Sequence, residues 1–277
     1  MIGTRGLPRA VAGTDRVPLP AAAPPSGGAR RRAIIGGAVL PLVLLALWQL
    51  TTVTGVFSVV QLPPPGMVLA AAVELAERGL LGTYVSISTQ RVLLGFGIGA
   101  SLGLLLGALT GLSPRWDVAL GSTLGAVRAV PSLAWVPLLV LWLKIGEDSK
   151  VTLIVIGAFF PVYTTVTGAL RHVDRHLVEA GRAFGLRGLR LFTTIQLPAA
   201  VPSVIAGLRL ALAQSWMFLV AAELIASSSG LGFLLVDSQN NGRVDRILLA
   251  IISLAVLGKA TDVILGIFER WAVRRWT

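Results

Sequence analysis

Residues 171–198 read RHVDRHLVEAGRAFGLRGLRLFTTIQLP, and this stretch decides how the rest of the chain is interpreted. It holds five arginines against one Asp and one Glu, and apolar segments long enough to cross a bilayer flank it on both sides. A basic loop between two such segments is typical of a chain that crosses a membrane repeatedly. The stretch is therefore interpreted as a water-exposed loop of a membrane protein.

The composition supports the same fold class. The chain has 277 residues, of which 55% are hydrophobic and 13% charged, whereas soluble globular chains carry about 25% charged residues. A net charge of +11 suggests nucleic acid in a soluble protein, but here the arginines lie beside apolar segments, so no nucleic-acid partner is expected. Without cysteine the chain can form neither a disulfide nor a thiolate metal site. We predict an all-α, polytopic membrane protein.

Six segments approach the ~20 apolar residues that cross ~30 Å of hydrocarbon. They cover residues 33–53, 85–112, 118–143, 151–170, 202–226 and 247–268. The third segment is the least regular, because it contains Arg128, Pro131 and Pro137. The sequence thus predicts about six transmembrane helices in one domain, residues 33–277. A disordered basic cytoplasmic arm, residues 1–32, precedes it, since its Pro, Gly and Arg cannot form a core.

The basic residues also predict the orientation in the membrane. With the N-terminus inside, the cytoplasmic pieces hold fifteen Lys and Arg and the outer loops only five. Positive residues stay preferentially on the cytoplasmic side. Both termini and the 171–198 loop are therefore expected in the cytoplasm.

The second segment carries glycine at every fourth position, namely Gly99, Gly103, Gly107 and Gly111. This spacing places the glycines on one helix face, where another helix can approach closely. We expect this contact to lie inside the subunit, with a contact between two subunits as the alternative.

The 171–198 loop has the pattern of two short helices. Asp174 is a plausible N-cap, and an apolar stripe follows at helical spacing in Leu177, Ala180, Gly181 and Phe184. Gly185 suits the left-handed position after a helix.

A second apolar stripe, Leu189, Phe192 and Ile195, is expected to end at Pro198, which cannot continue a helix. The predicted unit has a narrow apolar ridge and a basic flank. It could lie on anionic membrane lipid or dock into a groove on a partner protein.

The residues of this loop resemble a family signature. Glu179-Ala180-Gly181, Gly185 and the IQLP of residues 195–198 resemble the EAA motif of membrane subunits of bacterial ABC importers, with Gly181 where the pattern has Ala. Further stretches look like the aliphatic sulfonate, taurine and nitrate branch of that family. They are Leu62-Pro63-Pro64-Pro65, Arg128-Ala129-Val130-Pro131 with Pro137 and Trp142, residues 145–150 (IGEDSK), Ala222-Glu223 with Gly230-Leu231-Gly232, and Gly258-Lys259 with Asp262.

The resemblance implies a type I ABC importer permease (MetI-like) fold in the bacterial plasma (inner) membrane. It implies that residues 171–198 couple the chain to an ATP-binding subunit, and that the chain pairs as a homodimer and accepts solute from an extracytoplasmic binding protein. The docking residues would be Leu177, Glu179, Ala180, Gly181, Phe184, Gly185, Leu197 and Pro198. The solute would be a small organic sulfonate, taurine or a nitrate-like anion.

The sequence contains no G-x-x-x-x-G-K-[ST] phosphate loop, so ATP is expected on the partner subunit. We predict no catalytic site, no cofactor and no metal site in this chain. His172 and His176 have the spacing of a helical metal pair, but no fitting third ligand accompanies them.

Charged residues inside membrane segments are candidates for a solute path or gate, because they are costly in hydrocarbon. Arg128 with Pro131, and Glu223, are the candidates here. Arg128 could instead bond to backbone or extend its side chain toward the cytoplasm, and Glu223 could instead cap a helix. Arg91 and Arg209 lie near segment ends and are expected to reach the interface.

On the last segment, Lys259 and Asp262 are expected to pair with each other, because residues three apart share a helix face.

Two other functions remain open from the residues alone. A secondary transporter or channel for small anions would need no ATPase, but it would show matching broken helices in two halves, and none are visible. A membrane anchor without transport is disfavoured by the polar residues within the segments.

Overall fold

The computed structural model describes residues 27–276, and within them every regular element is a helix. The chain divides into two units, Met1–Trp48 and Gln49–Thr277. Helix α1 (Gly27–Val53) falls mainly in the first unit, contains Pro41 and exposes most of its described side chains. Of the predicted arm, residues 1–26 lie outside the described part, and residues 27–32 form the start of α1.

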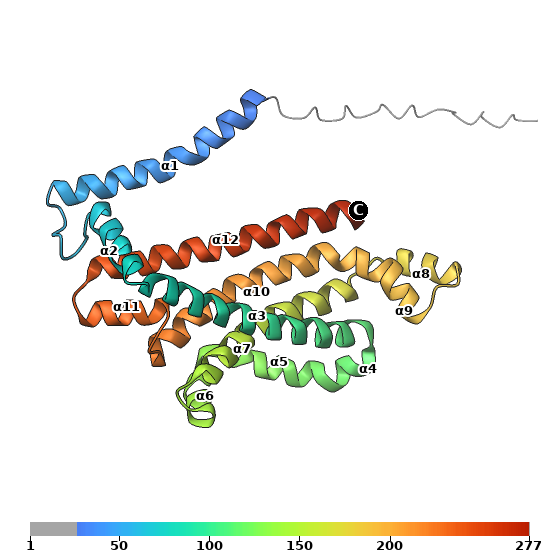
Figure 1. Ribbon diagram of the computed structural model, residues 1–277. Helices are drawn as coiled ribbons and strands as arrows, with labels where there is room; N and C mark the ends of the chain where they lie inside the picture. Colours follow the sequence, from blue (N-terminus) through green and yellow to red (C-terminus); the bar gives the residue numbers. More distant parts are fainter. Residues whose placement is uncertain (1–26, 277) are drawn as a thin grey trace, which may run out of the picture. The chain divides into compact units, whose positions relative to one another are not determined.

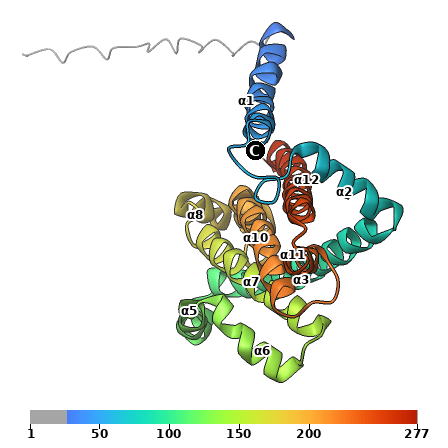
Figure 2. The same ribbon diagram turned by 90° about the vertical axis from the view of Figure 1, so that its left-hand side faces the viewer.

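The second unit is a set of long helices joined by short ones. Its elements are α2 (Pro65–Glu77), α3 (Leu80–Leu112), α4 (Pro114–Trp116), the π-helical turn η1 (Asp117–Gly121), α5 (Ser122–Ala129), the 3₁₀ turn η2 (Ser132–Trp135), α6 (Val136–Leu143), α7 (Glu147–Arg171), α8 (Arg175–Ala183), α9 (Gly188–Leu191), the π-helical turn η3 (Phe192–Gln196), α10 (Leu197–Ala226), α11 (Leu231–Asn240) and α12 (Val244–Trp276). Helix α7 packs against α3 and α10, and α10 packs against α12 (Figures 1 and 2).

Four described helices are long and apolar enough to cross a membrane: α3, α7, the continuous stretch Gly188–Ile225 and Val244–Ala272. They confirm the second, fourth, fifth and sixth predicted segments. The third is bent by 86° between Pro114–Ala129 and Ser132–Leu143, so it counts as a fifth span only if the bent pair is one. The apolar part of α1, Val39–Val53, is shorter, and the predicted count of six is not confirmed.

The bend has a local cause. Val130 is extended (φ −73°, ψ 124°) and ends α5 immediately before Pro131. A residue that precedes proline is pushed out of the helical region by the proline ring, and proline itself has no N–H to donate. The irregularity expected from Pro131 is therefore a sharp break of the helix.

The glycines of α3 pack against α7. A Cβ on Gly99 would lie 2.6 Å from the Val155 carbonyl oxygen, and one on Gly103 would lie 2.8 Å from Val162 Cβ. Buried Thr110 and Thr167 join the same two helices, with their Oγ1 atoms 2.9 Å apart. The prediction of a close contact inside the subunit is confirmed.

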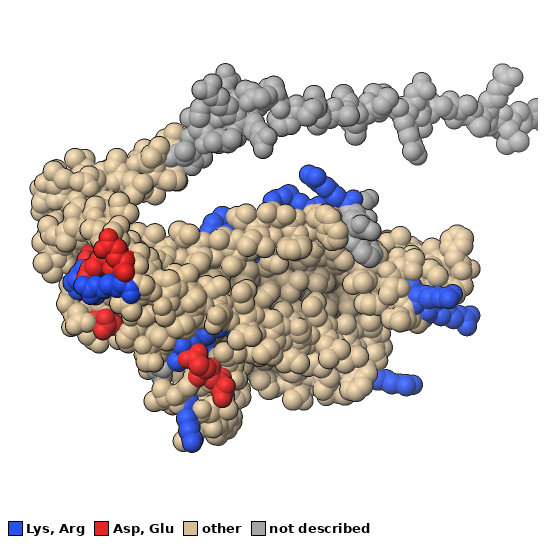
Figure 3. Space-filling model, viewed as in Figure 1, with Lys and Arg blue, Asp and Glu red and all other residues tan. Residues whose placement is uncertain are grey.

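Charges gather at the two ends of this unit (Figure 3). Lys and Arg project where α8 and α9 lie, and residues of both signs meet at the opposite end, beside α2 and α11. There Glu74 of α2 accepts hydrogen bonds from Arg243 (3.1 Å) and Arg246 (2.9 Å), near the start of α12. The hydrogen bond from Arg246, and after it the one from Arg243, lowers the pKa of Glu74 below its ordinary value.

Candidate functional site

Helix α8 begins and ends with its own capping bonds. The Asp174 carboxylate accepts from the His176 N–H at 2.8 Å, as the sequence predicted for an N-cap. At the other end, the Leu186 N–H donates to Gly181 O (3.0 Å) and the Gly185 N–H to Arg182 O (2.9 Å). Gly185 has a φ of 81°, which favours glycine. Both ends of α8 are thus fixed by the loop itself.

The predicted apolar stripe of α8 divides between two environments. Gly181 is buried, and a Cβ there would lie 2.8 Å from Leu191 Cδ1. Leu177 is 50% exposed, Phe184 is 87% exposed, and Ala180 is also exposed. The stripe therefore packs on the following segment through the glycine and presents its larger apolar side chains to the outside.

The expected end of the second short helix at Pro198 is wrong. Helix α9 continues through η3 into α10, so that one helical stretch runs over Gly188–Ile225. Pro198 lies in the first turn of α10, directly after the π-helical turn, where its missing N–H interrupts no regular α-helical bond. The loop is thereby joined rigidly to a membrane helix, and Leu197 and Pro198 are partly buried at the junction.

A cleft of about 570 Å³ separates α8 from the ends of α3 and α7. Arg171, Arg175, Arg182 and Glu179 line it, and Glu179 is exposed. Arg171 is held in place by an ion pair with Asp117. This end of the unit therefore presents a basic cleft beside an exposed apolar ridge.

A buried ion cluster lies at the opposite end. Arg91 of α3 is only 3% exposed. Its guanidinium donates to both carboxylate oxygens of Glu147 on α7 (2.6 and 2.5 Å) and to Glu223 Oε1 on α10 (2.6 Å). The expectation that Arg91 reaches the membrane interface is wrong, because two carboxylates from other helices neutralise it inside the protein.

Glu223 also fixes the start of α11. Its carboxylate accepts from Ser88 Oγ (2.8 Å) and from the Gly232 N–H (2.7 Å). Ser88 Oγ in turn accepts from the Leu231 N–H at 2.9 Å. Gly230 has a φ of 114°, and a Cβ there would collide with the Glu223 carboxylate. The side chain thus satisfies backbone donors at a helix start, as a cap does.

A second ion cluster joins α10 to α12. Arg209 donates to Asp262 Oδ1 (2.9 Å from Nε) and to Glu269 Oε2 (2.7 Å). The Arg209 side chain is still 37% exposed, so the expectation that it reaches the interface stays a prediction. Lys259 Nζ lies 3.2 Å from Asp262 Oδ2, which confirms the predicted pairing.

The sequence held an unused signal for one of these clusters. Asp262 and Glu269 are seven residues apart on one helix face, a spacing that marks a place for a cation. The partners of Arg91 lie 56 and 132 residues away along the chain, where no local pattern connects them.

The three path candidates are not brought together. Arg128 and Pro131 are exposed beside the bend between α5 and η2, whereas Glu223 is buried at the end of α10. None of the described hydrogen bonds or ion pairs links Arg128 to Glu223.

Comparison with known proteins gives a consistent result. The model of a family described as "Binding-protein-dependent transport system inner membrane component" matches residues 99–274. A Bacillus subtilis protein named "Putative aliphatic sulfonates transport permease protein SsuC" is 40% identical over 84% of this chain and 85% of its own length. The Escherichia coli taurine transport system permease protein TauC is 31% identical, over 82% of this chain and 85% of its own. The nitrate import permease protein NrtB of Synechocystis is also 31% identical, over 87% and 90%.

A solved structure shares the fold. A chain of the inward-facing MetNI methionine ABC transporter superposes with a TM-score of 0.60, covering 72% of this chain and 96% of its own length. At 19% sequence identity, this likeness concerns the fold alone.

Proposed function

The chain belongs to the binding-protein-dependent transport system inner membrane components, as an ABC importer permease of the sulfonate, taurine and nitrate type, and from this premise we propose its partners and solute. It carries a small oxyanion, such as an organic sulfonate, across the bacterial inner membrane. An extracytoplasmic binding protein delivers the solute, and a separate ATP-binding subunit drives the movement. The chain itself holds no ATPase site and needs no cofactor of its own.

The exposed ridge of α8 carries this proposal. Leu177 and Phe184 are 50% and 87% exposed at the end of a loop whose two helix caps are already satisfied. Large apolar side chains held rigidly outward are favourable anchors for a groove on another protein. Because α9 continues into α10, a displacement of the docked loop is transmitted to a membrane helix as a rigid-body movement.

The docking residues are Leu177, Glu179, Ala180, Gly181, Phe184, Gly185, Leu197 and Pro198. Leu177, Glu179 and Phe184 contact the ATP-binding subunit directly, and the two glycines and Pro198 shape the loop. The loop and both chain termini face the cytoplasm. The positive charge at the α8 end supports this orientation, since positive residues remain on the cytoplasmic side.

Two copies of the chain form the transport path. Arg128 is exposed beside the break at Pro131 in the third segment. An exposed cation within a membrane segment needs water or a partner. A second subunit facing this break provides a hydrated seam, with Arg128 and Pro131 in the path and Glu223 at its outer gate.

The solute class follows from the relatives. Their names specify aliphatic sulfonates, taurine and nitrate, all of which carry a small group of negatively charged oxygens. The common chemistry is the oxyanion and not the rest of the molecule.

The coupling role is tested by Phe184→Ser in proteoliposomes that contain the chain, its ATP-binding subunit and its binding protein. Loss of a central apolar anchor weakens docking by about 2 kcal/mol. ATP-dependent uptake of radiolabelled ethanesulfonate and co-purification of the ATP-binding subunit should both fall.

Val118→Ser is the matched control, because Val118 is 81% exposed, lies at the same end of the unit and is outside the loop. If Phe184→Ser and Val118→Ser lowered uptake and co-purification equally, the proposed coupling role of the loop would be wrong. Uptake that persists without any ATP-binding subunit would instead establish a secondary transporter or channel.

A further inference from the structure

The side chain of Glu147 lies between two buried cations. Its carboxylate receives two hydrogen bonds from Arg91 (2.6 and 2.5 Å) and one from Lys150 Nζ (3.1 Å). Arg91 and Lys150 are 3% and 6% exposed, while the Glu147 side chain is 61% exposed. The acid is thus the only outward-facing member of this group of three, and it can turn to solvent without moving either cation.

Arg91 is held in place independently of Glu147. On its other side, Nη1 donates to Glu223 Oε1 (2.6 Å) and to the Ser229 carbonyl oxygen (2.7 Å). Glu223 is fully buried and bonded to Ser88 and to the Gly232 N–H. Removal of the Glu147 carboxylate would therefore leave the Nε and Nη2 edge of Arg91 correctly oriented and without an acceptor.

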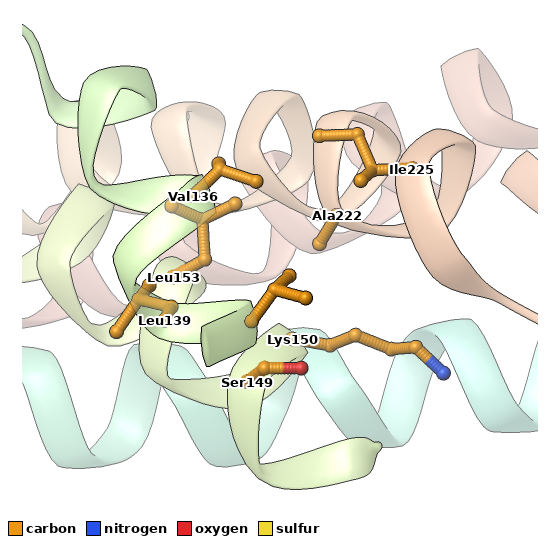
Figure 4. A pocket seen from close by; sticks show the side chains of 8 residues that line it. Val136, Leu139, Ser149, Lys150, Leu153, Ala222 and Ile225 are labelled. Atoms are coloured by element: carbon orange, nitrogen blue, oxygen red, sulfur yellow. The ribbon is translucent and has the colours of Figure 1, made fainter. Parts of the chain in front are cut away.

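Glu147, which covers this edge of Arg91, lines a cleft of about 530 Å³ whose other walls include Gly146, Lys150, Glu223, Ser227 and Ser228. The Lys150 stem runs past a small apolar pocket formed by Leu139, Leu153 and Ala222, and its nitrogen lies beyond these side chains (Figure 4). The apolar stem of Lys150 lies against apolar neighbours, and its ammonium lies on the polar side, near Glu147.

The donors have the geometry that recognises an oxyanion. An arginine edge with two parallel N–H groups binds two oxygens of one planar or tetrahedral anion, and lysine adds a compact positive charge. The buried cations Arg91 and Lys150 are balanced by Glu223 and Glu147. Exchange of the Glu147 carboxylate for a sulfonate or nitrate keeps this balance.

We propose that the Nε and Nη2 edge of Arg91 and the ammonium of Lys150 form an oxyanion-binding site, which Glu147 occupies as a tethered substitute while no ligand is bound. The inference rests on the proposed function only for the identity of the ligand, a sulfonate or a similar small oxyanion. A tethered carboxylate competes at an effective concentration of the order of millimolar. The site therefore binds its ligand weakly and releases it readily, as a transient station on a transport path must.

The experiment is equilibrium binding of radiolabelled methanesulfonate to the purified full-length chain in lipid nanodiscs. Glu147→Gln removes the competing charge and should bind methanesulfonate more tightly than the wild type by about tenfold or more. Adding Lys150→Gln to this variant should abolish the gain. Asp148→Asn is the matched control, since Asp148 is the next residue, is exposed, and has no ion pair among the described residues; its affinity should equal that of the wild type.

Equal affinities of Glu147→Gln and Asp148→Asn would overturn the proposal. So would equally tight binding of neutral methanesulfonamide, because the site would then not recognise charge. If Glu147→Gln does not fold, as judged by thermal unfolding, Glu147→Asp serves, since its shorter carboxylate reaches the cations less well and should give a smaller gain in affinity. The wild type could show normal ATP-dependent uptake but no methanesulfonate binding at this site. That result would reject the proposed site and leave the proposed function unaffected.

Discussion

At the scale of single residues, Arg91 and Glu223 determine the end of the second unit that lies opposite α8. Each is buried, each makes bonds to at least two other elements, and the pair joins α3, α7, α10 and the start of α11. A buried charge that loses its partner is far more costly than one that was never buried. The cluster therefore specifies which helices meet at this end.

Glu223→Gln is expected to lower the free energy of unfolding by about 3 kcal/mol, because Arg91 keeps only the exposed Glu147 as a counter-ion. Denaturant or thermal unfolding in detergent measures the change. Glu77→Gln is the control, since Glu77 is exposed and has no ion pair among the described residues. Equal stabilities of the two variants would show that the cluster does not stabilise the fold.

Two glycines of the loop should respond differently to alanine. Gly181→Ala places its Cβ against the tip of the flexible Leu191 side chain, which can move, so uptake should remain near the wild-type level. Gly185→Ala must adopt a φ of 81°, a conformation that costs roughly 1 kcal/mol or more in a residue with a Cβ. Hydrogen exchange of residues 175–191 should accelerate for Gly185→Ala alone, and a reversed order would contradict the capping geometry.

At the scale of elements, α3 and α7 form the closest helix pair of the unit. Glycines at every fourth position of α3 bring its backbone against Val155, Phe159 and Tyr163 of α7. In a membrane no water is expelled from such a contact, so close packing supplies much of the attraction between the helices. Any side chain on this face of α3 separates the two backbones.

Gly99→Ala should destabilise the protein by about 1–3 kcal/mol, because its Cβ would lie 2.6 Å from the Val155 carbonyl oxygen, which belongs to a helix backbone. Gly97→Ala on the same helix meets nothing within 4 Å and should leave the stability unchanged or slightly higher. Thermal unfolding of the two variants side by side checks the contrast. Equal unfolding temperatures would mean that this face of α3 does not pack as described.

At the scale of the whole molecule, the two ends of the second unit carry different chemistry. One end combines the exposed ridge of α8 with basic residues, and the other combines the Glu74 ion pairs with the buried Arg91 cluster. The proposed function depends on this difference, since solute is proposed to enter at one end and the ATP-binding subunit to act at the other.

The sidedness can be measured with single cysteines, because the chain contains none. Thr194→Cys in the loop and Asn240→Cys at the end of α11 are both exposed positions. A membrane-impermeant maleimide should label Asn240→Cys in intact cells and Thr194→Cys only after the membrane is opened. The reverse pattern would overturn the proposed orientation.

The sequence by itself determined the fold class, four of the long helices, the caps of α8 and the close glycine contact. Each of these depends on residues within one helix or one turn of each other, so composition and spacing suffice to predict it. The family resemblance likewise followed from short motifs, those of the 171–198 loop together with further stretches along the chain.

Only the tertiary structure decided the partners of Arg91 and Arg209, the passage of α9 through Pro198 into α10, and the division of the α8 stripe into a buried glycine and an exposed ridge. The partners of the two arginines and the environment of the α8 stripe depend on atoms of different elements. The passage through Pro198 depends on which of two helical hydrogen-bond patterns the backbone adopts. A charged side chain in a membrane segment must be neutralised, but which distant carboxylate neutralises it depends on how the helices pack. No local stretch of the chain determines that packing.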